Sequence, residues 1–246
     1  MMDKFKSRVI NEDKMKSYTQ QYLEKAKEII FVVENQESTI QEVAQLFATS
    51  ILNGRMVHLF GSGHSRMMVE EMWPRYGSFP GFNPIVELSV SFHNLVVGSN
   101  GQRQAMFLEN VSGLAPRILR NFDITEQDTA LIISSSGCNV LPIEMAEEYQ
   151  KKKVKVVALV SSLHLEGSSS KRTDGKKLID FADYVLDTGA PLGDAMIIID
   201  GLDTPVSPGS TLGGVLLVNT LKAEIANILV QNGKTPKVLS SGKIIG

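Results

Sequence analysis

The sequence is poor in cysteine and has no excess of either charge. Its single cysteine, Cys138, excludes an internal disulfide and a metal site built from several thiolates, which fits a reducing compartment. Its 25 basic and 27 acidic side chains give a net charge of -2, so no overall positive field attracts nucleic acid or anionic lipid. The first residues are charged where a signal peptide would be apolar, and the longest uncharged run, 204–221, begins too polar to span a membrane. We expect a cytoplasmic protein without nucleic-acid or membrane partners.

The composition is that of a folded globular chain. Hydrophobic residues make up 43% and charged residues 21% of the 246 positions, which excludes a disordered or collagen-like protein. This length allows one domain or two. Because no linker or composition break divides the chain, we expect a single domain with a helical arm at 1–34, a core at 35–235 and a tail at 236–246.

Strand and helix patterns alternate after the arm. Short apolar runs predict strands that are buried on both faces, at Met56–Phe60, Ile85–Leu88, Ala130–Ile133, Val154–Val160 and Tyr184–Leu186. Helical periodicity predicts helices at 14–34, 38–53, 65–73, 104–121, 140–152 and 210–231, the second beginning at a capping box of Ser38 and Gln41. This order predicts an α/β fold: a three-layer α/β/α sandwich around a doubly wound, five-stranded parallel sheet in flavodoxin-like order, with an N-terminal helical arm.

A glycine-rich turn follows the first predicted strand. It consists of Gly61, Ser62, Gly63, His64 and Ser65. Glycines between a strand and a helix let the backbone approach a ligand, and the helix N-terminus attracts an anion. Dinucleotide binding is disfavoured because Arg66 replaces the third glycine of that fingerprint. The turn therefore predicts a phosphate or nucleotide site, with a tight turn that serves only helix packing as the alternative.

A serine-rich turn follows the third predicted strand. Its residues are Ser134, Ser135, Ser136, Gly137, Cys138 and Asn139, and Asn139 is a suitable helix N-cap. Hydroxyl and backbone N–H groups at a helix N-terminus can hold a phosphate dianion without a lysine. Since ligands of open parallel sheets bind at the carboxyl ends of strands, we favour a phosphate cradle over solvated serines.

The two turns resemble those of the SIS (sugar isomerase) domain. The resemblance covers roughly residues 35–235 and is closest to phosphoheptose-isomerase-like SIS proteins, through GSGHSRMMVEEMWPRYG, Gly193–Ala195 and STLGGVLLVNTLKAEI. It implies a phosphosugar ligand, with Ser134, Ser136 and Asn139 at the family's phosphate-binding positions and Ser65 contributing from the first turn. We expect no cofactor.

Isomerising an aldose phosphate to a ketose phosphate requires a base that moves a proton between adjacent carbons. In phosphoheptose isomerases this base is a glutamate in a similar context, which implies Glu71. Its neighbour Glu70 diverges by about 100° on a helix, so which of the two faces the ligand stays open. The predicted last helix lacks the family's histidine, and His64 is the best substitute. Asp194 either orients a catalytic group, binds a sugar hydroxyl or forms a turn.

Three functions fit these residues. The first is a sugar-phosphate isomerase; the alternatives are a lyase or etherase of the N-acetylmuramic acid 6-phosphate type and a non-catalytic phosphosugar sensor. The four histidines lack the spacing of a zinc site, so no metal is expected. Apolar faces on the first and last helices exceed what a five-stranded sheet needs to cover, which predicts a homodimer or homotetramer.

Overall fold

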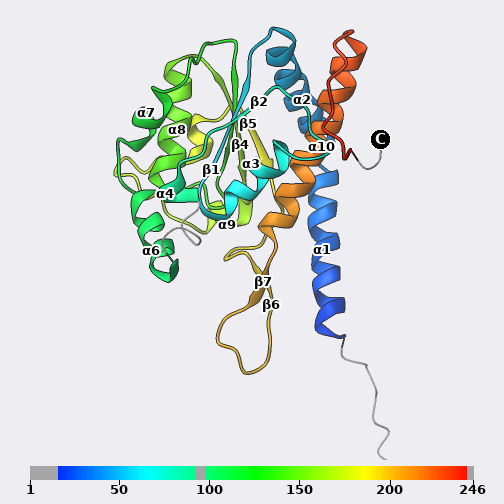
Figure 1. The fold of residues 1–246 in the computed structure, drawn as a ribbon. Helices are drawn as coiled ribbons and strands as arrows, with labels where there is room; N and C mark the ends of the chain where they lie inside the picture. The colour runs from blue at the N-terminus through cyan, green and yellow to red at the C-terminus, as the bar shows by residue number, and fades with distance from the viewer. Residues whose placement is uncertain (1–15, 92–97, 243–246) are drawn as a thin grey trace, which may run out of the picture.

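The computed structural model describes residues 16–91 and 98–242. At its centre lies a five-stranded parallel sheet in the order β2-β1-β3-β4-β5 (Figure 1). The strands are β1 (Val57–Gly61), β2 (Phe82–Pro84), β3 (Thr129–Ile133), β4 (Lys155–Val160) and β5 (Tyr184–Asp187). This order is the flavodoxin-like one, and the predicted α/β fold is confirmed.

The edge strand β2 lies earlier than the sequence predicted. Phe82 pairs with Val57, and the pairing ends at Pro84, which can occupy an edge strand because its missing N–H is not needed there. Of the predicted strand Ile85–Leu88, Ile85 is buried and Leu88 starts a short helix, α4 (Leu88–Ser91). The prediction failed because an apolar run after a turn does not reveal where pairing stops.

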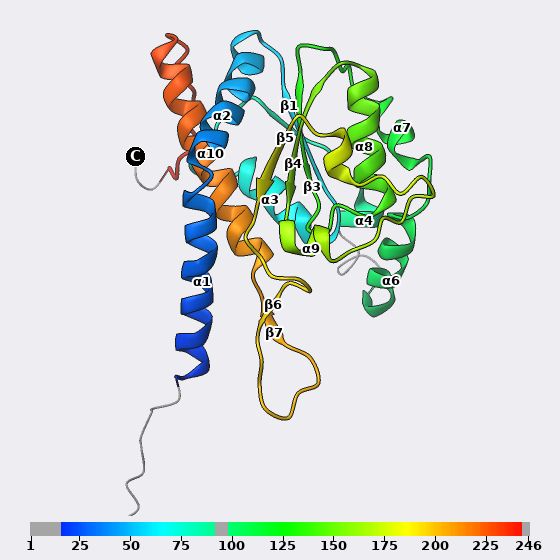
Figure 2. The ribbon, with the colours of Figure 1, turned by 180° about the vertical axis from the view of Figure 1, so that it is seen from behind.

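Helices cover both faces of the sheet (Figure 2). One face carries α2 (Glu37–Leu52), α3 (Arg66–Met72) and α10 (Ser210–Gln231), with α1 (Tyr18–Glu34) packed on α10. The other face carries α4, α6 (Gly98–Leu108), α7 (Leu114–Leu119), α8 (Val140–Lys151) and α9 (Ser162–Glu166). By length and composition α10 is apolar enough to cross a membrane, but its Leu217, Leu221 and Ile225 are fully buried in the core.

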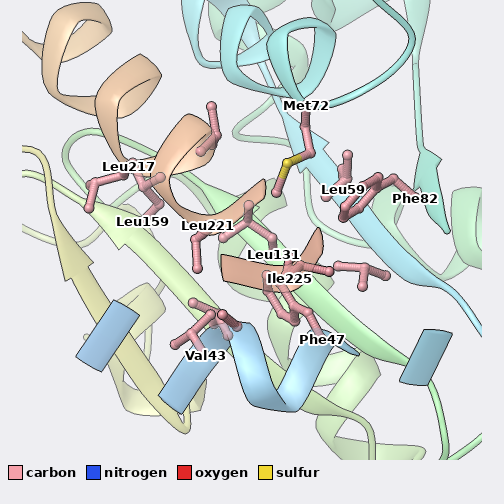
Figure 3. Close-up of a cluster of buried hydrophobic side chains, with 14 of the residues drawn as sticks. Val43, Phe47, Leu59, Met72, Phe82, Leu131, Leu159, Leu217, Leu221 and Ile225 are labelled. Atoms are coloured by element: carbon pink, nitrogen blue, oxygen red, sulfur yellow. The ribbon is translucent and has the colours of Figure 1, made fainter. Parts of the chain in front are cut away.

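Alternate strand residues form two cores. Leu59, Leu131 and Leu159 face α2 and α10, where they meet Phe47 and Ile225 (Figure 3). Their neighbours along the same strands contribute to the opposite core against α8. Burial of each leucine side chain contributes roughly 1.5–3 kcal/mol to the stability of the fold. The strands are continuous apolar runs in the sequence because helices cover both faces of the sheet.

Three predicted helix boundaries were wrong. The helix predicted from residue 14 begins at Tyr18, because Ser17 caps it with a hydrogen bond from the Gln20 N–H. The expected helix 104–121 is divided into α6 and α7 by Gly113, at φ +86°, and Pro116 could not have continued a helix from the preceding turn. The helix predicted from Ser38 begins at Glu37, after Gln36, whose side chain instead exchanges two hydrogen bonds with the Asp187 backbone. The backbone conformation at Gly113 sets the boundary between α6 and α7, and a tertiary contact of Gln36 accompanies the start of α2.

A small antiparallel hairpin, not anticipated from the sequence, follows β5. Its strands are β6 (Ala195–Ile197) and β7 (Val206–Pro208). The hairpin extends from the core on the same side as the N-terminal end of α1 (Figures 1 and 2), and the Tyr22 hydroxyl donates to the carbonyl of Pro208 at 3.3 Å. Since β5 leads into β6, and β7 into α10, the hairpin brings the start of α10 to the carboxyl edge of the sheet.

Candidate functional site

The turn after β1 folds tightly because two positions require glycine. A Cβ on Gly61 would lie 2.6 Å from the carbonyl oxygen of Ser65, and Gly63 adopts φ +52°. A short 3₁₀ turn, Gly63–Ser65, then leads into α3 and leaves the His64 side chain exposed. The glycines thus have a structural cause, and the turn presents His64 and Ser65 at the carboxyl edge of the sheet.

The turn after β3 keeps several unused donors. The Ser134 hydroxyl accepts from the Gly137 N–H at 3.2 Å, and the Ser136 hydroxyl accepts from the Cys138 N–H at 3.3 Å. Both hydroxyls can still donate their own protons. Among the described residues no partner is found for the backbone N–H groups of Ser135 and Ser136. The turn can therefore donate to an anion from both backbone and side chains.

The N-terminus of α8 is less open than the sequence indicated. Asn139 is the N-cap residue, but its side chain makes no cap and donates to Glu109 Oε1 at 2.9 Å. The N–H of Leu141 donates to the Glu109 carbonyl at 2.8 Å, and that of Val140 to Asn110 Oδ1 at 3.4 Å. The segment between α6 and α7 thus takes the place that a ligand would otherwise have at this helix end.

A cavity of about 130 Å³ lies at the carboxyl edge of the sheet. It is lined by His64, Ser65, Met68, Ile133, Ser135, Leu159, Thr188, Asp194, Ser210 and Thr211. The polar residues of this lining come from the turns after β1 and β3, from the segment after β5 and from the start of α10, while Met68 of α3, Ile133 of β3 and Leu159 of β4 form its apolar wall. The structure therefore brings the two predicted turns and Asp194 together, with Ser135 rather than Ser134 or Ser136 on the cavity wall.

Asp194 caps α10. Its Oδ1 accepts from the backbone N–H groups of Gly209, at 3.1 Å, and Ser210, at 2.7 Å, and its Oδ2 accepts from the Ser210 hydroxyl at 2.8 Å. A carboxylate at this position is stabilised by the partial positive charge of the helix N-terminus. Asp194 thus forms part of a turn, with its backbone at φ +70°, and also lines the cavity.

A second cavity of about 70 Å³ shares His64 with the first. Its wall includes Gly63 and, from α6 and the residue after it, Met106 and Glu109. The Ser62 hydroxyl donates to Glu109 Oε2 at 2.7 Å, and Asn139 donates to Oε1 of the same carboxylate. The Glu109 carboxylate therefore connects the turn after β1 with the turn after β3 by hydrogen bonds.

The Glu109 carboxyl has the environment of a proton-transfer group. Burial raises its pKa, and the hydrogen bonds from Ser62 and Asn139 offset only part of this effect. Neither lysine nor arginine pairs with it among the described residues. A carboxyl with a raised pKa beside a cavity is suited to general acid–base chemistry. Sequence reasoning missed Glu109 because it lay within one predicted helix; its only signal was Gly113, which breaks that helix.

The glutamates selected from the sequence lie elsewhere. Glu71 forms an ion pair with Arg75 and accepts from Asn219 Nδ2 of α10 at 2.8 Å. Burial raises its pKa, but the hydrogen bonds from Asn219 and Arg75 outweigh burial, and the pKa is lowered. Glu71 lines neither cavity, and Glu70 is exposed beside Arg66, 3.4 Å away. The structure does not bring either residue to the two turns.

The remaining polar candidates have other environments. His58 is buried in β1, with Asn83 Nδ2 2.9 Å from its Nδ1. Cys138 is buried and its thiol pKa is raised by burial, which does not favour a nucleophile. In residues 16–91 and 98–242 no three His, Cys, Asp or Glu side chains are arranged to hold a metal.

Comparison with known proteins shows the family to which the chain belongs. The model of the SIS domain family matches residues 21–161, more than half of the chain, and the chain therefore belongs to the SIS domain family. A UPF0309 protein of Halalkalibacterium halodurans is 35% identical over 87% of this chain and 86% of its own. A UPF0309 protein of Listeria monocytogenes is 30% identical over 87% of this chain and 84% of its own.

Solved structures share the fold. The phosphoheptose isomerase of Neisseria gonorrhoeae superimposes with a TM-score of 0.51 at 13% identity, covering 84% of this chain and 95% of its own. That of Francisella tularensis gives 0.51 at 16% identity, covering 83% and 94%. At such identity the likeness establishes the fold alone.

Proposed function

We propose that the protein binds a sugar phosphate at the carboxyl edge of its sheet. The observation that carries this proposal is the cavity that joins the turns after β1 and β3, where Ser65 and Ser135 provide hydroxyls. The unpaired N–H groups of Ser135 and Ser136 add donors, so phosphate can be held without a cation. SIS family membership supports the same ligand class.

The reaction that we propose is aldose–ketose isomerisation. It requires a group that removes the proton from C2 of the sugar and returns it to C1 while a second group assists at the oxygens. Glu109 and His64 line the same small cavity beside the phosphate turns, so we assign proton transfer to Glu109 and assistance to His64. The two phosphoheptose isomerases named above share the fold, so this fold accommodates such a reaction.

Glu71 is the competing base, because the family resemblance selects it. Its lowered pKa and its bonds to Arg75 and Asn219 make it a weaker base than Glu109. The two assignments make opposite predictions for conservative variants, and they can be separated in one experiment.

The test is deuterium exchange at C2. The protein is incubated in D₂O with hexose, heptose and amino-sugar phosphates, and the C2 proton is followed by NMR. We expect Glu109→Gln to slow exchange by about 10²–10⁴-fold and Glu71→Gln and the exposed control Glu70→Gln to retain it. Loss in Glu71→Gln alone would return the role to Glu71. Release of a lactyl group would instead identify an etherase, and ligand-induced melting shifts without exchange a sensor.

Phosphate binding has a separate test. A carboxylate introduced by Ser136→Asp would lie in the turn after β3 and repel a phosphate dianion. We expect this variant to lose thermal stabilisation by sugar phosphates, whereas Ser169→Asp, on an exposed loop, keeps it. Unchanged stabilisation of the Ser136 variant would contradict the assignment of this turn.

We also propose that a second copy of the chain covers the α1 face. Leu23 and Phe31 are exposed on α1. A groove of about 400 Å³ between α1, α2 and α10 is lined by apolar Ile30, Val33, Ile40 and Leu216 and by polar Glu34, Glu37, Thr220 and Glu224. Exposed apolar side chains beside polar ones are typical of an interface with an apolar centre and a polar rim. Light scattering should give the mass of a dimer or tetramer, and a monomer would contradict the proposal.

A further inference from the structure

Carboxylates, but no cationic side chain of lysine or arginine, line the two cavities in the described part of the chain. Asp194 contributes to the larger cavity, Glu109 to the smaller, and His64 lies between them. A ligand with one phosphate can be held by the neutral donors of the turn after β3. A second anionic group would have to lie beside a carboxylate.

The Asp194 carboxylate determines which ligand groups can bind at the start of α10. A helix N-terminus ordinarily attracts an anion, but here the Asp194 carboxylate already occupies it and uses the N–H groups of Gly209 and Ser210. Like charges placed together cost free energy, so an anionic ligand group is excluded from this end of the cavity. Phosphate is therefore directed to the serine turn.

The same carboxylate can accept a donor from the ligand. Oδ1 receives two hydrogen bonds, whereas Oδ2 receives only one, from the Ser210 hydroxyl at 2.8 Å. One acceptor position of Oδ2 remains for a hydroxyl or an amino group. The carboxylate is fixed in place, because the Asp194 carbonyl also accepts from the N–H of Gly209 at 3.0 Å, at the base of the β6–β7 hairpin.

We infer that Asp194 makes the site selective for a sugar that carries a single phosphate and no second acidic group, with a hydroxyl or amino group directed to Oδ2. This inference rests on the proposed binding of a sugar phosphate and names its substrate class. Acidic sugar phosphates are rejected by repulsion at Asp194, which is selection against a competitor rather than added attraction for the ligand.

The test compares pairs of ligands in which a small substituent, a methyl ester or an N-acetyl group, removes the charge of one group. Calorimetric titration of the full chain uses N-acetylmuramic acid 6-phosphate and the methyl ester of its lactyl group, and separately glucosamine 6-phosphate and N-acetylglucosamine 6-phosphate. We expect the ester to bind at least tenfold more tightly than the acid, and the amino sugar at least as tightly as its acetylated form.

Asp194→Asn supplies the matched variant, because the amide keeps the size and can still accept from the two N–H groups while losing the charge. It should reduce the difference between ester and acid to less than threefold, whereas Asp200→Asn, exposed on the hairpin, should leave it unchanged. Equal binding of acid and ester by the wild type would overturn the selectivity while leaving the proposed function intact. If neither these compounds nor inorganic phosphate binds, the proposed function fails as well.

Discussion

Two carboxyl groups at opposite edges of the sheet have pKa values shifted in opposite directions. Asp128 lies at the amino edge, directly before β3, and its pKa falls to about 2. Burial alone would raise that pKa, but the Arg55 guanidinium at 2.7 Å and the N–H groups of Thr125 and Met56 outweigh it. In the part of the chain that the structure describes, no arginine pairs with Glu109 at the carboxyl edge, and burial raises the pKa of its carboxyl group.

The difference separates stability from chemistry. A carboxylate with a lowered pKa favours the folded state above pH 4, whereas one with a raised pKa disfavours it once the carboxyl ionises. The Asp128 carboxylate at the amino edge thus contributes to folding, whereas the Glu109 carboxyl at the carboxyl edge, which we propose for proton transfer, lowers stability when it ionises. Five predictions test this comparison, in order of decreasing effect.

The largest effect is expected from Arg55→Met. It leaves the fully buried Asp128 carboxylate without its cation, and breaking a buried ion pair costs about 3–5 kcal/mol. Urea denaturation should show a free energy of unfolding lower by about 3 kcal/mol, while Arg120→Met, an exposed control, changes it by less than about 0.5 kcal/mol. A loss below 1 kcal/mol for the Arg55 variant would remove the basis of the comparison.

Acid should remove the contribution of Asp128. Its stabilisation is fully present above the unfolded pKa of 3.8 and is lost as the pH falls towards about 2, which corresponds to about 2 kcal/mol. Denaturation curves between pH 5 and 2 should therefore converge for the wild type and Asp128→Asn. A constant difference between them over this range would contradict the lowered pKa.

Glu109→Gln should stabilise the protein at neutral pH while abolishing exchange. For a raised pKa, stability is highest below the unfolded value and falls as the pH rises through the folded pKa, so a neutral amide avoids that loss. We expect a gain of about 1 kcal/mol at pH 8, against no change for the exposed control Glu126→Gln. Destabilisation of the Glu109 variant would show that its carboxylate is a structural acceptor.

Ser62→Ala should shift the pH profile of C2 exchange and have little effect on the free energy of unfolding. Without the Ser62 hydroxyl, the Glu109 carboxylate loses a donor at 2.7 Å and its pKa rises further. The pH dependence of C2 exchange should move to higher pH, whereas Ser89→Ala, at an exposed position, leaves it in place. A shift to lower pH would contradict the assignment of the profile to Glu109.

The smallest effect is expected from Tyr149→Phe at the amino edge. Its ring stacks on His58 at 5.7 Å, but its buried hydroxyl has no partner among the described residues. Removing an unpaired hydroxyl should change the free energy of unfolding by less than about 0.5 kcal/mol. A loss above 1 kcal/mol would mean that a bound water joins the hydroxyl to the amino-edge network.

Local patterns predicted most of the fold. Apolar runs located β1, β3, β4 and β5, because strands covered on both faces need apolar residues throughout. They misplaced β2, since a short edge strand ends where pairing ends and not where apolar residues do. The first turn could be predicted because close backbone packing, as at Gly61, requires glycine. The second could be predicted because three serines directly follow an apolar strand.

The catalytic candidates were harder to predict, because no local sequence pattern shows which side chains from different helices and turns lie close together in the fold. Resemblance selected Glu71, whose bonds to Arg75 and Asn219 depend on how α3 packs on α10. Glu109 could not be selected, because only the break between α6 and α7 directs it to Ser62 and Asn139.

The sequence by itself determined the order of strands and helices, the positions of the two turns and the need for neutral donors to hold an anion at a net charge of -2. Only the tertiary structure decided which carboxyl group lines a cavity, which one pairs with a cationic side chain and which one caps α10. The reason is physical: a pKa depends on burial and on charges a few ångströms away, and those neighbours come from distant parts of the chain.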